Sequence, residues 1–169
     1  KDSKLYCESV SVEDVCKKIE TPFYLYSSDQ IINNYKLLSD RLKFCNVLIA
    51  YAVKANSNIS VLRILAKKGA GADVVSYGEL LRAIKAGIPG KKIVFSGVGK
   101  SDLEISKAID HRILQFNVES SHELFTIEKI AKDKGVAANI SIRVNPDITA
   151  GGHPKISTGK KTDKFGISV

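Results

Sequence analysis

The sequence predicts an α/β fold of parallel strands alternating with helices, either a doubly wound sheet or a (β/α)8 barrel. Short apolar runs rich in β-branched residues alternate with segments whose apolar residues recur at the three- and four-residue spacing of a helix. The run at 47–53 is almost continuously apolar, which is typical of a parallel strand buried on both faces. About five strand–helix units can be traced, whereas a complete barrel takes about 250 residues. We therefore expect a portion of such a domain.

The expected elements follow one another along the chain. An apolar run at 23–26 precedes Ser27-Ser28-Asp29, whose side chains suit the start of a helix over 29–43. The strand at 47–53 leads into a helix over 59–68. The remaining elements are expected as strands at 72–75, 92–96, 113–118 and 139–144, helices at 77–86, 101–109 and 121–134, a loop over 145–164 and the start of a further element at 165–169.

Glycines mark two of the expected turns. Gly135 follows the last helix, as a C-cap glycine does. The run Gly97-Val98-Gly99-Lys100-Ser101 stands between a strand and a helix, but a phosphate-binding P-loop needs a glycine where this sequence has Val94. We expect a tight turn there, with Ser101 as the helix cap. No GxGxxG follows the first strand, which argues against a dinucleotide-binding sheet.

Composition indicates a globular protein of the cytoplasm. The formal net charge is +8, but the lysines are scattered in pairs without interleaved aromatic residues, so a nucleic-acid partner is not expected. No apolar run reaches about 18 residues, so no membrane span is expected. The three cysteines have no metal-binding spacing, and the sequence predicts free thiols and no metal site. Because the chain contains no methionine, we expect it to be part of a longer protein.

Lys54 is the first candidate catalytic residue. It ends the apolar strand at 47–53, and the carboxyl ends of barrel strands are where catalytic residues gather. Desolvation beside an apolar wall lowers the pKa of an amine, and a neutral amine can attack a carbonyl to form a Schiff base. The alternative is a strand-end lysine whose ammonium simply reaches water.

Asp73 and Glu79 are the next candidates. Asp73 is the only ionisable residue in its short strand, so it needs a cationic or hydrogen-bonding partner. Ser76 and Glu79 have the spacing of a capping box at the start of a helix. Capping and a place in the site are both consistent with this pattern.

Arg143 is the fourth candidate, because an arginine in an apolar strand is costly unless it is paired. It could hold a phosphate, a carboxylate or a neighbouring acid such as Asp73 or Glu79. A structural ion pair is the alternative. His153 stands in the polar loop, and a lone histidine there indicates no function by itself.

Seven segments, taken in order, resemble the diaminopimelate decarboxylase family. They are TPFYLYS, YAVKANSN, GADVVSYGEL, IVFSGVGKS, FNVES, RVNPD and HPKISTG…DKFGI, which together reach from Thr21 to Ile167, close to the end of the chain. Ornithine and arginine decarboxylases of the same fold share fewer of these segments. Tyr77 departs from the pattern, since many members have a small residue there, and this affects packing more than chemistry.

The resemblance implies a fold and a cofactor. It implies a pyridoxal 5′-phosphate (PLP) barrel of the alanine-racemase type over 27–169, with 1–26 leading into it and able to pair with a β-domain absent from this chain. PLP would be bound through Lys54, with Asp73, Glu79 and Arg143 in the cofactor pocket. The family's ring-stacking histidine and its glycine-rich phosphate loop would follow Val169, as would the partner subunit's cysteine. A homodimer is expected for the same reason.

The activity that the resemblance implies is decarboxylation of meso-2,6-diaminopimelate to L-lysine and CO2, with the PLP ring as electron sink. Two alternatives remain open. One is decarboxylation of another basic amino acid or polyamine precursor, and the other is a non-catalytic PLP-binding paralogue. The intact YAVKANSN segment favours an enzyme over such a paralogue.

Overall fold

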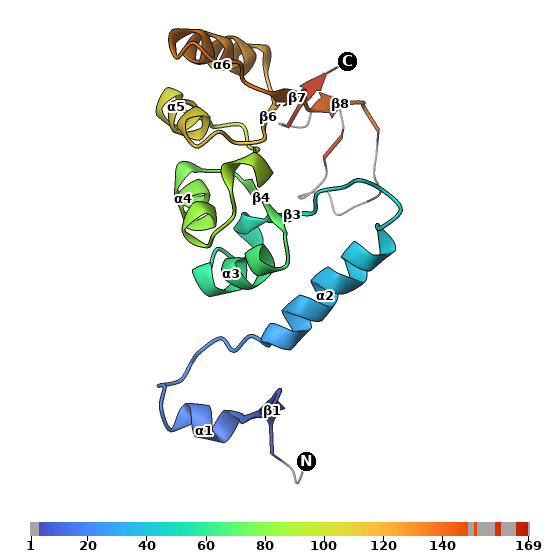
Figure 1. Cartoon of the computed structure of the whole chain (residues 1–169), viewed down its shortest axis with the longest axis vertical. Helices are drawn as coiled ribbons and strands as arrows, with labels where there is room; N and C mark the ends of the chain where they lie inside the picture. The colour runs from blue at the N-terminus through green and yellow to red at the C-terminus, as the bar shows by residue number, and fades with distance from the viewer. Residues whose placement is uncertain (1–3, 149–150, 152–157, 160–164, 169) are drawn as a thin grey trace. The chain divides into compact units, whose positions relative to one another are not determined.

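The computed structural model describes residues 4–148, 151, 158–159 and 165–168. It divides into two compact units, Lys1–Val47 and Leu48–Val169. The first unit contains β1 (Tyr6–Cys7), β2 (Val10–Ser11), α1 (Val12–Cys16) and α2 (Ser28–Arg41), with β1 and β2 paired antiparallel (Figure 1). Among the described residues no helix is long and apolar enough to cross a membrane.

Within the first unit, one carboxylate ties the β1–β2 turn to the start of α2. Glu8 accepts hydrogen bonds from the backbone N–H of Asp29 and the hydroxyl of Ser27, each at 2.8 Å. The bond from Asp29, followed by that from Ser27, lowers the pKa of the Glu8 carboxyl. The apolar run at 23–26 does not form a strand, and Tyr24 within it is 89% exposed. Apolar composition alone does not make a strand without a paired neighbour.

The second unit alternates strands and helices. Its elements are β3 (Ala50–Ala52), the 3-10 turn η1 (Val53–Ala55), α3 (Ile59–Lys67), β4 (Gly71–Val74), α4 (Tyr77–Lys85), η2 (Gly90–Lys92), β5 (Ile93–Phe95), α5 (Asp102–Asp110), β6 (Gln115–Val118), α6 (Ser121–Asp133), β7 (Ile140–Ile142), β8 (Val144–Asn145) and β9 (Ile167–Ser168).

The main sheet has the order β3-β4-β5-β6-β7, and every neighbouring pair is parallel. Consecutive strands are therefore neighbours, each joined to the next by one helix. Figure 1 shows α3 to α6 stacked along one side of the sheet. Doubly wound sheets carry helices on both faces, whereas barrels carry them on the outer face only. The predicted α/β fold is confirmed, as a segment of a barrel.

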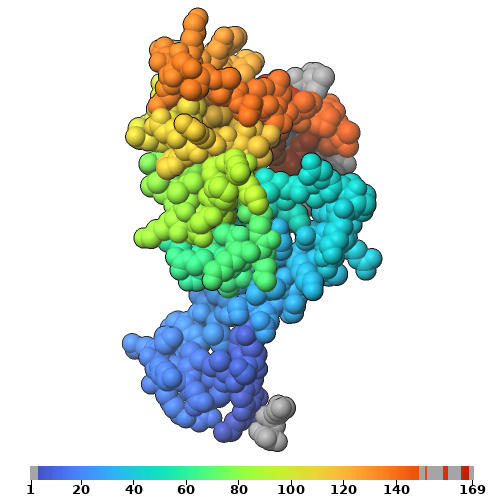
Figure 2. Space-filling view, in the orientation of Figure 1, coloured from blue at the N-terminus to red at the C-terminus, as the bar shows by residue number. Residues whose placement is uncertain are grey.

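The core lies between the sheet and these helices. Phe95 and Phe116 stack with ring centroids 6.2 Å apart, and both are buried. Each helix contributes a buried aliphatic side chain to the same core, namely Leu62, Leu80, Ile105 and Ile127. Figure 2 shows the outer surface of this helical layer from green to orange. Because side chains alternate across a strand, the other face of the sheet is left to the residues in between.

Two strands differ from the expectation. The run at 47–53 forms a strand only over Ala50–Ala52, because β3 has a neighbour on one side alone within the described sheet. The run at 139–144 divides at Arg143, where β7 ends and β8 turns to pair with β9. Most of the 145–164 loop, including the histidine at 153, lies outside the described residues.

The predicted helix ends are confirmed. Ser101 caps α5 in a complete capping box with Glu104. Gly135 follows α6 with φ +65°, in the left-handed region that glycine adopts at little cost.

Candidate active site

A row of hydrogen-bonded polar side chains crosses the inner face of the sheet near the carboxyl ends of β4, β5 and β6. Asp73 Oδ1 accepts a bond from the Ser96 hydroxyl at 2.6 Å, and Ser96 Oγ accepts one from Asn117 Nδ2 at 2.9 Å. Gln115 Nε2 donates to Asn117 Oδ1 at 2.9 Å. Ser96 is therefore the hydrogen-bonding partner that Asp73 needs, and the sequence analysis did not identify it.

Lys54 lies at the same end of the sheet. The register pairs Ala52 with Asp73, and Lys54 follows two residues after Ala52, in η1. Val53 is fully buried and anchors the turn, while Lys54 is exposed. Its Nζ makes no hydrogen bond or ion pair with any residue that the structure describes. The amine is therefore available to a ligand at the sheet's carboxyl edge.

Glu79 is placed by the start of α4. The Ser76 hydroxyl accepts a bond from Glu79 N at 3.2 Å, as expected for a helix cap. The return bond of the predicted capping box goes one residue further back, since Glu79 Oε2 accepts from Val75 N at 2.8 Å. Within the described chain no hydrogen bond or ion pair joins Glu79 to Lys54 or Asp73. Glu79 therefore lies at the carboxyl end of the sheet, and its carboxylate is bound to the N–H of Val75.

Arg143 has a different acid partner from those expected. Its Nη1 lies 3.4 Å from Glu119 Oε1, and its guanidinium carbon lies 5.0 Å from the centre of the Phe165 ring. No ion pair to Asp73 or Glu79 is formed in the part of the chain that is described. The Arg143 side chain is 42% exposed, and that of Glu119 is 1% exposed. Only the acid of this pair is buried.

Glu119 is an acidic site residue that sequence reasoning missed. Its Oε1 also accepts a bond from Gly97 N at 3.0 Å. A signal was present in the sequence, because Glu119 directly follows an apolar strand and precedes the Ser120 cap of α6. An acid at the carboxyl end of a barrel strand is a candidate site residue, as Asp73 is.

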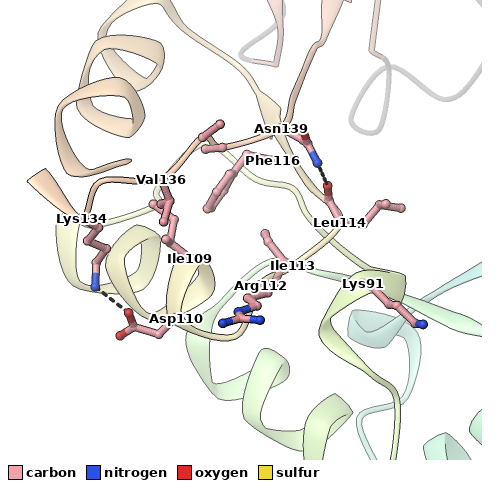
Figure 3. A pocket seen from close by; sticks show the side chains of 12 residues that line it. Lys91, Ile109, Asp110, Arg112, Ile113, Leu114, Phe116, Lys134, Val136 and Asn139 are labelled. Atoms are coloured by element: carbon pink, nitrogen blue, oxygen red, sulfur yellow. Dashed lines mark hydrogen bonds and ion pairs between the residues drawn. The ribbon is translucent and has the colours of Figure 1, made fainter. Parts of the chain in front are cut away.

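Two cavities lie at opposite ends of the sheet. The smaller, of about 290 Å³, is lined by Ser96, Asn117, Glu119, Ser141 and Arg143. The larger, of about 740 Å³, surrounds the amino ends of β6 and β7 and is lined by residues that include Lys91, Ile113, Phe116, Lys134 and Asn139 (Figure 3). Since barrel enzymes act at the carboxyl ends of their strands, the smaller cavity marks the candidate site.

Comparison with known proteins decides the family. Residues 28–169 match the family described as pyridoxal-dependent decarboxylase, pyridoxal binding domain. The chain belongs to this decarboxylase family. A curated relative, diaminopimelate decarboxylase of Helicobacter pylori, is 54% identical over 155 residues, which are 92% of this chain and 38% of the relative.

Solved structures of related decarboxylases have the same fold. The H. pylori diaminopimelate decarboxylase complexed with L-lysine is 52% identical, with a TM-score of 0.89 over 92% of this chain and 40% of that one. The diaminopimelate decarboxylase of M. jannaschii in complex with L-lysine is 42% identical, with a TM-score of 0.91 over 100% and 40%. This chain therefore spans about two fifths of the length of these relatives.

The site's own residues fit the cofactor of a pyridoxal-dependent decarboxylase. PLP carries an aldehyde and several anionic oxygens. Lys54 offers an amine without a protein partner, and Arg143 offers guanidinium N–H groups beyond the one that faces Glu119. Asp73 Oδ2 makes no hydrogen bond within the described residues, so it can accept one. The donors and acceptors on this edge match such a group chemically.

Proposed function

We propose that this chain supplies Lys54 as the cofactor-binding lysine of a PLP-dependent decarboxylase that converts meso-2,6-diaminopimelate to L-lysine and CO2. The observation that carries the proposal is the amine of Lys54, exposed and without a protein partner at the carboxyl edge of a pyridoxal-binding domain. The substrate rests on relatives named diaminopimelate decarboxylase at up to 54% identity. We also propose that the complete enzyme has the length of these relatives and works as a cytoplasmic homodimer.

The proposed roles follow from the contacts of each side chain. Lys54 would hold the cofactor covalently through Nζ. PLP, when bound, supplies the electron sink that accepts the electron pair left by departing CO2. Asp73, fixed by the Ser96 hydroxyl, accepts a hydrogen bond in the pocket. Arg143 donates hydrogen bonds to an anionic group there.

Glu79 has a supporting role in this proposal. Its carboxylate bonds the N–H of Val75, the residue that follows β4. Asp73 lies two residues before Val75, so this bond fixes the end of the strand that carries Asp73. Glu79 thus contributes to the cofactor pocket by fixing the end of β4.

The test is chemical labelling of Lys54 in the full-length protein. Incubation with PLP followed by borohydride should add one pyridoxyl group to Lys54, located by peptide mapping. Lys54→Ala should lose the adduct and almost all CO2 release from diaminopimelate. Lys67→Ala is the matched control, because Lys67 is an exposed lysine at the end of the next helix. An adduct or normal CO2 release in Lys54→Ala would refute the assignment.

The substrate is tested separately by comparing CO2 release from diaminopimelate, ornithine, arginine and lysine at equal concentration. Diaminopimelate is expected to give the highest kcat/KM. A preference for another amino acid would overturn the substrate and leave the role of Lys54 standing. Binding of PLP at Lys54 without decarboxylation of any of the four would favour a non-catalytic paralogue.

A further inference from the structure

A buried chain of charges leads from the centre of the sheet to Arg143. Lys100, in the turn after β5, donates three hydrogen bonds: to Gly97 O at 2.6 Å, to Asn117 O at 2.8 Å and to Glu123 Oε1 at 2.5 Å. The Lys100 and Glu123 side chains are 1% and 7% exposed. All three ammonium protons are used, so this pair is held in one geometry.

Glu123 connects this ion pair to Glu119. Its second oxygen, Oε2, accepts a bond from the backbone N–H of Glu119 at 3.1 Å. The Glu119 side chain is then fixed by Gly97 N, so both its backbone and its carboxylate have assigned partners. A buried carboxylate with such bonds cannot turn to water without losing them.

Arg143 is the cation at the end of the chain, and it is held far less firmly. It directly follows β7, the strand at the edge of the described sheet, and its side chain is half-exposed. The 3.4 Å contact with Glu119 is long for a charge-assisted hydrogen bond, which is typically about 2.7–2.9 Å. Glu119 Oε2 is buried and has no hydrogen-bond partner within the described residues. The acid therefore has capacity left for a closer, two-bond contact with the guanidinium.

We infer that Glu119 is a positioning residue, which holds the Arg143 guanidinium at the cavity formed with Ser96, Asn117 and Ser141 so that it can bind an anionic group of the cofactor. The inference rests on the proposed function. Glu119 lines the same cavity, but its side chain is only 1% exposed, whereas that of Arg143 is 42% exposed. It acts through Arg143, and Lys100 and Glu123 act through Glu119.

The test is a double-mutant cycle on the dissociation constant of PLP, measured by absorbance titration of the full-length protein. A hydrogen bond to a charged group contributes about 1.5–3 kcal/mol, so Glu119→Gln should weaken PLP binding by about tenfold to a hundredfold. Glu119→Asp should recover part of this loss. In an Arg143→Met background, Glu119→Gln should have almost no further effect, because its route to the ligand is gone.

Glu128→Gln is the matched control, since Glu128 is an exposed acid on α6 and should bind PLP as the parent does. An equal loss from Glu119→Gln in both backgrounds would mean a general structural role and would overturn the inference, as would unchanged PLP affinity. If Glu119→Gln does not fold, Glu119→Asp completes the same cycle. Borohydride labelling of Lys54 in the parent separates the two ideas, because its absence refutes the proposed function, whereas labelling with no Glu119–Arg143 coupling refutes only the positioning.

Discussion

Lys100→Met should be among the most destabilising single changes outside the apolar core. The substitution keeps an unbranched chain of similar length and removes the ammonium with its three hydrogen bonds. The carboxylate of Glu123 would remain 7% exposed, without the cation that it has here. Removing one partner of a buried ion pair costs about 3–5 kcal/mol. This is a large share of the roughly 5–15 kcal/mol that stabilises a typical domain.

The assay is urea unfolding followed by far-ultraviolet circular dichroism, with the free energy of unfolding compared between variants. Lys107→Met is the control, because the Lys107 and Asp110 side chains are exposed and 3.9 Å apart. An exposed pair of this kind contributes about 0–1 kcal/mol. Adding Glu123→Gln to Lys100→Met should recover part of the loss, since the amide can still accept from Glu119 N without burying a charge. A cost below about 1 kcal/mol for Lys100→Met would refute this account of the network.

Two further predictions concern the core and the acid limit of stability. Phe95→Ala should cost about 3–5 kcal/mol of unfolding free energy, because it removes one ring of the buried stack with Phe116. Phe125→Ala, at an exposed position of α6, should change the unfolding free energy by less than about 0.5 kcal/mol. Equal effects of the two substitutions would contradict the assigned core. The hydrogen bond from Lys134 lowers the pKa of the Asp110 carboxyl below its usual 3.8. The ionised carboxyl therefore stabilises the folded state above pH 3.8, and this stabilisation is lost as the pH falls through the lower pKa of the folded state. Asp110→Asn should remove that part of the acid dependence, measured as urea midpoints between about pH 5 and pH 2, and an unchanged profile would contradict it.

Helix limits were more predictable from the sequence than strand limits, for a local reason. A helix start depends on nearby residues, and the Ser101 and Ser76 caps lie where their spacing predicts. A strand depends on a partner distant in sequence. The apolar run at 23–26 has none in the structure, and the run at 47–53 keeps only its central part. Apolar composition could not distinguish these two cases.

The candidate residues could be named from the sequence, but the acid that pairs with Arg143 could not. Lys54 ends one apolar run, and Asp73 and Arg143 lie within two others, while the parallel topology brings the carboxyl ends of these strands to one edge of the sheet. Which acid meets Arg143 depends on strand order. Arg143 N donates to Val118 O at 2.9 Å, so β7 lies next to β6, and Glu119 follows directly on β6. Asp73 is two strands further away, on β4.

Glu123, which the sequence analysis did not single out, shares a pattern with Glu79. Three helix starts carry a serine followed three residues later by a glutamate: Ser76 and Glu79, Ser101 and Glu104, and Ser120 and Glu123. Glu79 and Glu123 each accept a bond from the N–H of the residue before the cap, Val75 and Glu119, whereas Glu104 accepts one from the N–H of the cap residue Ser101 itself. Helix capping and site construction are therefore not alternatives in this fold. The serine hydroxyls satisfy the helix N-termini, and the Glu79 and Glu123 carboxylates fix the residues that directly follow β4 and β6.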